Sequence, residues 1–205
     1  MDLEKVFQKN KTKLLGFKNQ YSVLILLTEI KGEQHIIFEK RGMRISQPGE
    51  VSLPGGMIEP GESPLNAARR EASEELQIRE SDIHIIGEID SIYDFKDRVI
   101  NIFIGRIQEF RVEEFLNNEE VEYVFTYPIS YFIENKPKIY KNGLNNEIKE
   151  SFPFELIPNG KNYKLKKIKS TTYFYEKTNP LIWGLTAKII SKFIDICEGE
   201  SSEQR

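Results

Sequence analysis

The sequence is poor in the residues that build disulfides and zinc sites, and it has no long apolar run. Its single cysteine, Cys197, cannot form a disulfide within the chain. Two histidines, His35 and His84, are too few to build a zinc site of the cysteine–histidine type. The longest aliphatic run, residues 23–27, is far shorter than the ~20 residues of a membrane helix. These absences predict a cytoplasmic protein, in which any hydrolytic chemistry must depend on carboxylates or hydroxyl groups.

The sequence also lacks an excess of charge of one sign. The chain has 29 basic and 32 acidic residues, a net charge of −3, which gives no bulk attraction to nucleic acid or to a membrane surface. A length of 205 residues suits one domain, at roughly 150 residues per domain. We therefore expect a helical extension at residues 1–20, a single domain at residues 21–198 and a flexible tail at residues 199–205. A small-molecule partner is expected, and a homodimer stays open.

Hydrophobic periodicity predicts an α/β fold in which a mixed sheet carries helices on its faces. The expected helices are residues 1–18, 63–77 and 181–197. The expected strands are residues 21–30, 34–40, 83–93, 99–107, 121–127 and 171–175. Residues 41–56 are rich in glycine and proline and predict a loop. The polar stretch at residues 136–170 predicts only short strands and turns.

The helix expected at residues 63–77 carries three carboxylates on one edge. At about 100° per residue, Glu71, Glu74 and Glu75 fall within about 100° of one another around the helix. Glu62 comes just before the helix begins. Like charges at these spacings repel, and a hard divalent cation such as Mg²⁺ would offset the repulsion because it prefers carboxylate oxygens. The spacing therefore makes these four acids candidate metal ligands.

A solvated surface helix is the alternative interpretation of the same acids. Arg70 and Glu74 are four residues apart and could form an ordinary surface ion pair. The preceding stretch, residues 54–56, is Pro-Gly-Gly, which lets the backbone approach a ligand closely. Gly61 then turns the chain into the helix. A glycine-rich loop leading into four positioned acids favours a ligand site over surface decoration.

Residues 56–78 resemble the signature of the Nudix hydrolase family. That signature is Gly, five residues, Glu, seven residues, then Arg-Glu-aliphatic-any-Glu-Glu-any-Gly-aliphatic. The matching residues, at full spacing, are Gly56, Glu62, Arg70, Glu71, Glu74 and Glu75. Two positions depart from it, since Ala72 is small and Gln77 replaces the final glycine. A left-handed backbone at Gln77 would cost about 1 kcal/mol or more, and it would affect the end of the helix rather than the metal.

The resemblance implies an α/β/α sandwich and an enzyme that hydrolyses a diphosphate linked to another moiety, using Mg²⁺ or Mn²⁺. A metal ion neutralises phosphate charge and lowers the pKa of bound water. By position in the motif, Glu74 and Glu75 are the implied principal metal ligands, and Glu71 is a further ligand or the base. The resemblance also implies that Glu62 is a helper near the metal and that the Gly55 carbonyl is a ligand. Arg70 would orient the acids.

Residues 36–56 resemble the coenzyme A pyrophosphatase branch of the family, most clearly at residues 49–56, where a leucine stands in place of phenylalanine. Residues 182–187 and 118–121 are similar as well, and Glu120 is a candidate base or metal ligand. The branch implies coenzyme A as substrate, with 4′-phosphopantetheine and 3′,5′-ADP as products. Candidate substrate-binding residues are Lys40, Arg41, Arg44, Gly55 and Gly56, and the three cations suit the 3′-phosphate.

Two alternatives stay open. ADP-ribose or another nucleoside diphosphate derivative is an alternative substrate, because the loop departs from the coenzyme A branch at Gln47 and Leu53. A non-catalytic module that senses a nucleotide is an alternative of another class. Such modules usually lose acids of the motif, whereas this chain retains them.

Overall fold

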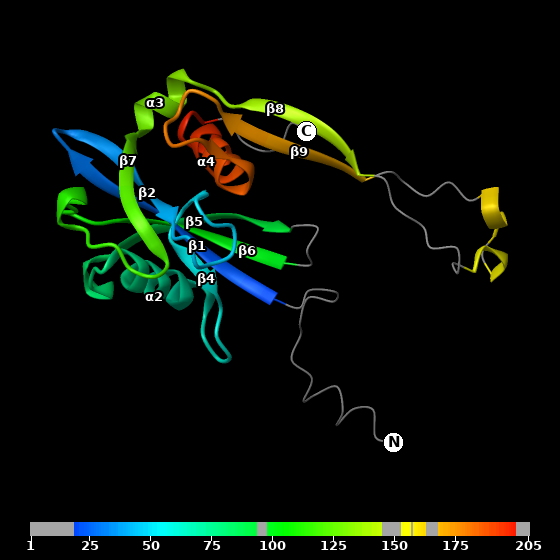
Figure 1. Ribbon diagram of the computed structural model, residues 1–205, viewed down its shortest axis with the longest axis horizontal. Coiled ribbons are helices and arrows are strands. Elements are labelled where there is room, and N and C mark those ends of the chain that lie inside the picture. The colour runs from blue at the N-terminus through cyan, green and yellow to red at the C-terminus, as the bar shows by residue number, and fades with distance from the viewer. Residues whose placement is uncertain (1–18, 94–97, 145–152, 157, 163–167, 200–205) are drawn as a thin grey trace. The chain divides into compact units, whose positions relative to one another are not determined.

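A computed structural model of the protein describes residues 19–93, 98–144, 153–156, 158–162 and 168–199 (Figure 1). The helix expected at residues 1–18 and most of the expected tail lie outside the described residues. The chain divides into two compact units, residues 1–128 and 129–205. The sequence predicted a single domain over residues 21–198, and the boundaries of that domain stay a prediction. Among the described helices, none combines the length and the apolar character needed to cross a membrane.

The first unit is built on a mixed sheet of seven strands. They are β1 (Asn19–Ile30), β2 (Glu33–Arg41), β3 (Val51–Ser52), β4 (Gly55–Met57), β5 (His84–Tyr93), β6 (Arg98–Arg106) and β7 (Val121–Pro128). The main path runs β3-β2-β1-β6-β5, with β4 paired to β1 and β7 paired to β2. β1 and β6 are parallel, whereas the other pairs are antiparallel. The mixed sheet of the expected α/β fold is thereby confirmed.

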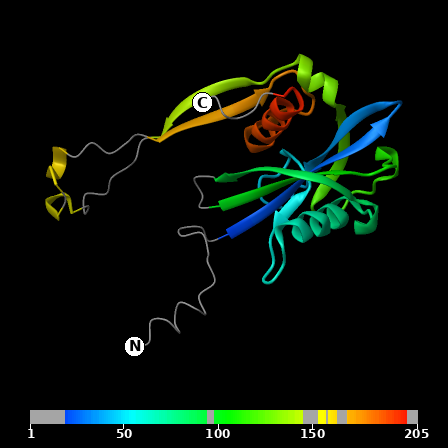
Figure 2. The same cartoon turned by 180° about the vertical axis from the view of Figure 1, so that it is seen from behind.

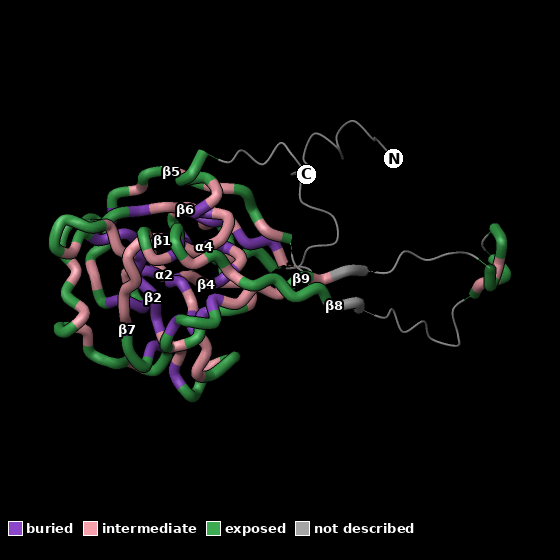
Figure 3. Tube along the Cα trace, turned by 90° about the horizontal axis from the view of Figure 1, so that it is seen from above, coloured by how far each residue is buried: buried purple, intermediate pink, exposed green. Residues whose placement is uncertain are grey.

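Helix α2 (Pro64–Leu76) lies along one face of this sheet (Figure 2). Its buried side chains Ala67, Ala68 and Ala72 are small, so the helix backbone can approach the strands closely. Figure 3 shows the buried residues gathered in β1, β2 and β6 around it. The core beneath the helix includes Leu24, Leu26, Ile37, Phe103, Val121 and Val124. Each fully buried leucine or isoleucine contributes roughly 1.5–3 kcal/mol, which fixes α2 on the sheet.

Short 3₁₀ turns and a second sheet complete the chain. The turns of the first unit are η1 (Glu80–Asp82) and η2 (Val112–Glu114). The elements of the second unit are α3 (Ile129–Glu134), β8 (Lys138–Leu144), η3 (Phe154–Leu156), η4 (Gly160–Asn162), β9 (Ile168–Tyr175), β10 (Ile182–Trp183) and α4 (Gly184–Cys197). β10, β9 and β8 form an antiparallel sheet in that order. Phe132 packs edge-on against Tyr175, with the ring centroids 4.9 Å apart.

The helix expected at residues 181–197 begins three residues later than predicted, at Gly184. Residues 182 and 183 form β10 instead and pair with β9. Gly184 has a φ of 65°, a conformation that favours glycine and that separates strand from helix. Leu181 and Ile196, near the two ends of the expected helix, are exposed. The buried face of α4 consists of Ala187, Ile189, Ile190, Phe193 and Ile194.

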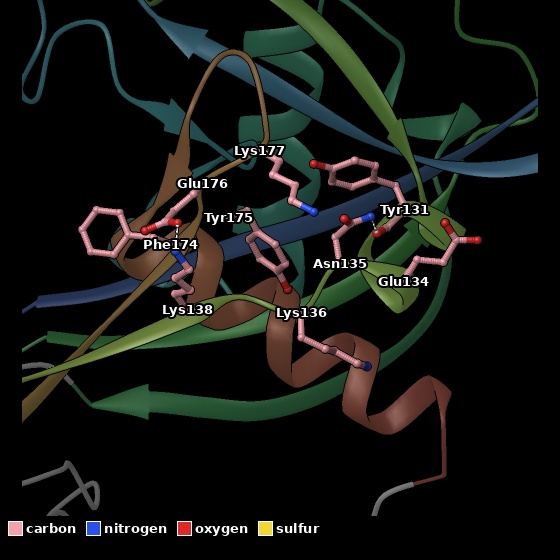
Figure 4. Close-up of a pocket in the computed structure, with 9 residues that line it drawn as sticks. All are labelled: Tyr131, Glu134, Asn135, Lys136, Lys138, Phe174, Tyr175, Glu176 and Lys177. Atoms are coloured by element: carbon pink, nitrogen blue, oxygen red, sulfur yellow. Dashed lines mark hydrogen bonds and ion pairs between the residues drawn. The ribbon is translucent and has the colours of Figure 1, made fainter.

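The second unit contains a cavity of about 310 Å³ formed by residues of α3, β8, β9 and their connections (Figure 4). Two of its three lysines are in ion pairs, since Lys138 contacts Glu176 and Lys136 contacts Glu198. No acid of the motif between residues 62 and 75 is among its lining residues. The chemistry expected from the sequence therefore belongs to the first unit rather than to this cavity.

Candidate active site

Both ends of α2 are set by its own sequence. The Ser63 hydroxyl accepts a hydrogen bond from the Asn66 N–H at 3.2 Å, and Pro64 occupies the first turn, where an N–H is not needed. At the other end Gln77 adopts the left-handed conformation, with φ 57° and ψ 40°. This conformation costs a non-glycine residue roughly 1–2 kcal/mol. The Gln77 side-chain amide donates to the Leu116 carbonyl at 2.7 Å, which offsets part of that cost.

Two glycines bring β4 against the acids of α2. A Cβ on Gly56 would lie 2.3 Å from the carboxyl carbon of Glu71. A Cβ on Gly55 would lie 2.3 Å from the Ser22 carbonyl oxygen. The Gly55 N–H donates to Oε2 of Glu75 at 2.7 Å. Backbone atoms exclude a side chain at Gly55, whereas a side chain at Gly56 would displace the Glu71 carboxyl, so the two glycines keep this backbone close to the acids. The metal-ligand role of the Gly55 carbonyl stays a prediction.

Arg70 gathers three of the acids around one guanidinium group. Its Nε donates to Oε1 of Glu62 at 3.0 Å. Its Nη1 lies 2.9 Å from Oε1 of Glu71 and 3.2 Å from Oε2 of Glu74. The hydrogen bond from Arg70 lowers the pKa of the Glu62 carboxyl. Glu74 is the most exposed of the three, with 62% of its side chain accessible. This geometry suits the orienting role implied for Arg70, and that role stays a prediction.

The innermost acid of the helix, Glu75, faces a second buried carboxyl that the sequence analysis missed. This is Glu39 of β2, which is 1% exposed, while Glu75 is 6% exposed. Burial raises the pKa of Glu39. Burial, followed by the charge of Glu39, raises the pKa of Glu75. An acid directly after the apolar residues 36–38 is the signal that could have revealed it.

Glu120 adds a further carboxylate from outside the helix. Its charge raises the pKa values of Glu39, Glu71 and Glu75, so its carboxylate lies near all three. For Glu71, burial is the largest cause of the raised pKa, and the neighbouring Arg70 partly opposes it. The structure thus brings together acids of β2, α2 and the loop before β7.

A network of backbone and amide hydrogen bonds positions the loop that carries Glu120. The Asn118 Oδ1 accepts from the N–H groups of Glu120 at 2.9 Å and Val121 at 2.7 Å. The Asn118 Nδ2 donates to the Glu75 carbonyl at 3.1 Å. The Gly42 N–H donates to the Glu120 carbonyl at 2.7 Å. Asn118 and Gly42 were both absent from the sequence-based candidates.

The chemistry of these donors fits a hard divalent cation. Carboxylate oxygens are the ligands that Mg²⁺ and Mn²⁺ prefer, and a buried carboxyl oxygen of Glu39 has no hydrogen-bond donor. Within the described ranges, no three acidic, histidine or cysteine side chains already converge as a metal-binding group. Arg70 and the Gly55 N–H hold the carboxylates of Glu71 and Glu75 instead. A cation at Glu71 would therefore compete with Arg70 for its carboxylate.

The three cations expected to bind substrate lie at the end of β2 and in the loop that follows. Arg41 donates from Nε to the Ser46 carbonyl at 3.0 Å, and its charge lowers the pKa of Glu39. Lys40 is half-buried on β2, and Arg44 is exposed in the loop. Arg41 therefore lies beside the acids, while the described contacts do not bring Arg44 to them.

Comparison with known families identifies the family of the chain. A model of the NUDIX domain matches residues 18–172. The chain belongs to this family. It is a Nudix hydrolase rather than the non-catalytic module that the sequence left open, and Nudix hydrolases generally require a divalent cation. The choice between Mg²⁺ and Mn²⁺, the cytoplasmic location and a homodimer stay predictions.

Curated relatives are similar over different shares of the chain. Nudix hydrolase 3 of Caenorhabditis elegans is 29% identical over 179 residues, which cover 85% of this chain and 72% of that protein. The peroxisomal coenzyme A diphosphatase NUDT7 of Mus musculus is 29% identical over 125 residues, which cover 60% of this chain. The second match spans about half of the relative, 51% of its length.

A solved structure supports the fold alone. The MutT/nudix family protein from Enterococcus faecalis has a TM-score of 0.52 at 14% identity, over 96% of this chain and 69% of that one. The predicted Nudix-type α/β fold is confirmed by the family match together with the mixed sheet and α2.

Proposed function

We propose that this Nudix hydrolase cleaves the diphosphate of coenzyme A or of one of its derivatives. The observation that carries the proposal is the loop at residues 49–56, which resembles the coenzyme A branch except at Leu53 and whose Gly55 N–H binds Glu75 of α2. The likeness to a mouse coenzyme A diphosphatase supports it. The products would be 4′-phosphopantetheine and 3′,5′-ADP.

The reaction is the addition of water across a P–O–P linkage. The water oxygen bonds to one phosphorus, the bond from that phosphorus to the bridging oxygen breaks, and the second phosphate leaves with the bridging oxygen. A carboxylate accepts the proton that the water loses, and Glu71 or Glu120 is the base we propose. A bound divalent cation supplies charge neutralisation and an acidified water. Glu74 and Glu75 would hold the cation, with Glu62 in support, and Arg70 would keep the acids oriented.

The 3′-phosphate distinguishes coenzyme A from most other diphosphates. Arg41 is the cation best placed to bind it, because it lies at the end of β2 beside Glu39, and a guanidinium group suits phosphate. Lys40 and Arg44 are the neighbouring candidates on the strand and the loop. Gly55 and Gly56 let the diphosphate approach the backbone.

The decisive experiment is a product-resolved assay with each metal. Coenzyme A, dephospho-coenzyme A and ADP-ribose are incubated with the protein and Mg²⁺ or Mn²⁺, and the products are separated by chromatography. We expect coenzyme A to be cleaved with the highest kcat/KM. Faster cleavage of ADP-ribose would assign the alternative substrate instead.

Two variants separate substrate recognition from chemistry. Arg41→Ala is expected to raise KM for coenzyme A about tenfold, the loss of one charge-assisted phosphate contact, while KM for dephospho-coenzyme A changes little. Glu75→Gln is expected to abolish turnover of every substrate with the fold intact. Glu88→Gln, at an exposed acid of β5, serves as the control. Unchanged activity in Glu75→Gln would contradict the ligand role.

A further inference from the structure

We propose that Glu39 is a further carboxylate of the divalent-cation site at α2, with its Oε2 serving as an oxygen donor beside Glu75. The inference rests on the proposed metal site and is independent of which diphosphate is the substrate. It assigns a role to a strand residue that lies outside the helix motif.

Glu39 projects into the apolar layer between β2 and α2. Its neighbour on the same face of the strand is Ile37, and its partner across the sheet is Val124. Both of these residues belong to the core beneath the helix. At 1% exposure, Glu39 is therefore a carboxyl group in a position where an apolar side chain would pack.

The hydrogen bonds of Glu39 leave one oxygen for a ligand. The Ser52 hydroxyl, from the paired strand β3, donates to Oε1 at 3.0 Å and fixes the orientation of the carboxyl group. Oε2 is fully buried and has no fixed hydrogen-bond donor among the described residues. Only a proton on the adjacent Glu75 carboxyl can bond to it, and that hydrogen bond lowers the pKa of Glu39. The group that faces it is the carboxyl of Glu75.

Glu75 is held in a matching way. The Gly55 N–H donates to its Oε2 at 2.7 Å, so each of the two buried carboxyls has one oxygen fixed by a protein donor. The charge of Arg41 acts on Glu39, but the Nε of Arg41 is bound to the Ser46 carbonyl. The protein thus fixes the orientation of both carboxyls, but no lysine or arginine of the described residues donates a hydrogen bond to Oε2 of Glu39.

A purely structural role does not explain this arrangement. A buried carboxyl next to a second one is unfavourable, and well-packed apolar residues in such positions are often neutral or stabilising. Groups that are kept despite such a cost are typical of functional sites. A divalent cation between the two carboxyls would supply both the missing charge and a partner for Oε2.

Metal binding measured without substrate tests the proposal. Mg²⁺ and Mn²⁺ are titrated into the full chain by calorimetry, and bound Mn²⁺ is followed by its electron paramagnetic resonance signal. Glu39→Gln keeps the shape of the side chain and removes its charge. We expect a dissociation constant for the metal at least tenfold higher than in the wild type, together with a metal-free melting temperature that is equal or higher. Glu88→Gln, the matched control, is expected to bind metal like the wild type.

Ser52→Ala provides a second variant that keeps the carboxyl and removes only its orienting hydrogen bond. We expect a smaller loss of affinity, about threefold, as for one modest hydrogen bond. If Glu39→Gln binds both metals with wild-type affinity, Glu39 is a structural residue and the proposal is wrong. If the wild type itself binds neither metal, the proposed site at α2 fails, and the inference fails with it.

Discussion

The Asn118 side chain joins two separate parts of the site, because its Nδ2 donates to the Glu75 carbonyl at 3.1 Å while its Oδ1 accepts from the Glu120 N–H at 2.9 Å. One uncharged amide therefore links the last turn of α2 to the loop that carries the outlying acid. The distance between these carboxylates depends on a residue that contributes no charge.

Removal of this link is expected to impair turnover more than substrate binding. Asn118→Ala deletes three hydrogen bonds, each worth about 0.5–1.5 kcal/mol to stability, and releases Glu120 from its fixed position. We expect kcat to fall at least tenfold with a smaller change in KM. Asn117→Ala, at the exposed neighbour on the same loop, is the control. A fall in melting temperature with kcat unchanged would show that Asn118 only stabilises the fold.

A methyl group at Gly56 is expected to disable the site by displacing an acid. The added Cβ would lie 2.3 Å from the carboxyl carbon and 2.4 Å from each oxygen of Glu71, so that carboxyl must move. We expect Gly56→Ala to lose metal-dependent turnover by more than a hundredfold. Gly87→Ala is the matched control, because its Cβ would meet nothing within 4 Å. Retention of activity in Gly56→Ala would mean that the position of Glu71 is not important.

Replacement of Arg70 by lysine tests whether the geometry of the guanidinium group matters. Arg70 reaches Glu62, Glu71 and Glu74 at once through different nitrogens. A lysine ammonium keeps the charge but cannot hold three acids in that arrangement. We expect Arg70→Lys to lower kcat at least tenfold. Arg111→Lys, in an exposed pair with Glu114, is expected to leave kcat unchanged. If the two variants have equal kcat values, Arg70 contributes to turnover through its charge alone.

The sequence predicted α2 well because local chemistry determines it. The Ser63 cap, Pro64 and the small buried alanines all act within the helix or directly beneath it. The family motif has glycine at the position of Gln77, and the structure has a left-handed residue there. The acids of α2 were found for the same reason, since their spacing along a helix fixes which side they share.

The residues that the sequence analysis missed depend on pairing between distant segments. Glu39 faces Glu75 only because β2 packs beneath α2, and the alternation of one strand does not show which helix covers it. Asn118 is a loop residue whose role depends on a carbonyl at the end of α2. The apolar residues 182–183 of the strand run directly into the apolar helix α4, so the sequence pattern does not show where one ends. Only the positive φ of Gly184 marks the boundary.

The buried pair Glu39 and Glu75 also predicts how stability depends on pH when no metal is bound. Their pKa values are raised above the ordinary 4.5, so the folded protein binds more protons than the unfolded chain between 4.5 and the raised values. Stability therefore falls as pH rises through this window. The charge of Glu120 raises the pKa values of both carboxyls, the charge of Glu71 raises that of Glu75, and Arg41 lowers that of Glu39. Urea unfolding in a chelator, from about pH 5 to about pH 9, should show a steeper decline for the wild type than for Glu39→Gln. Saturating Mg²⁺ is expected to remove most of the difference, and equal slopes for the two proteins in the chelator would contradict the assignment.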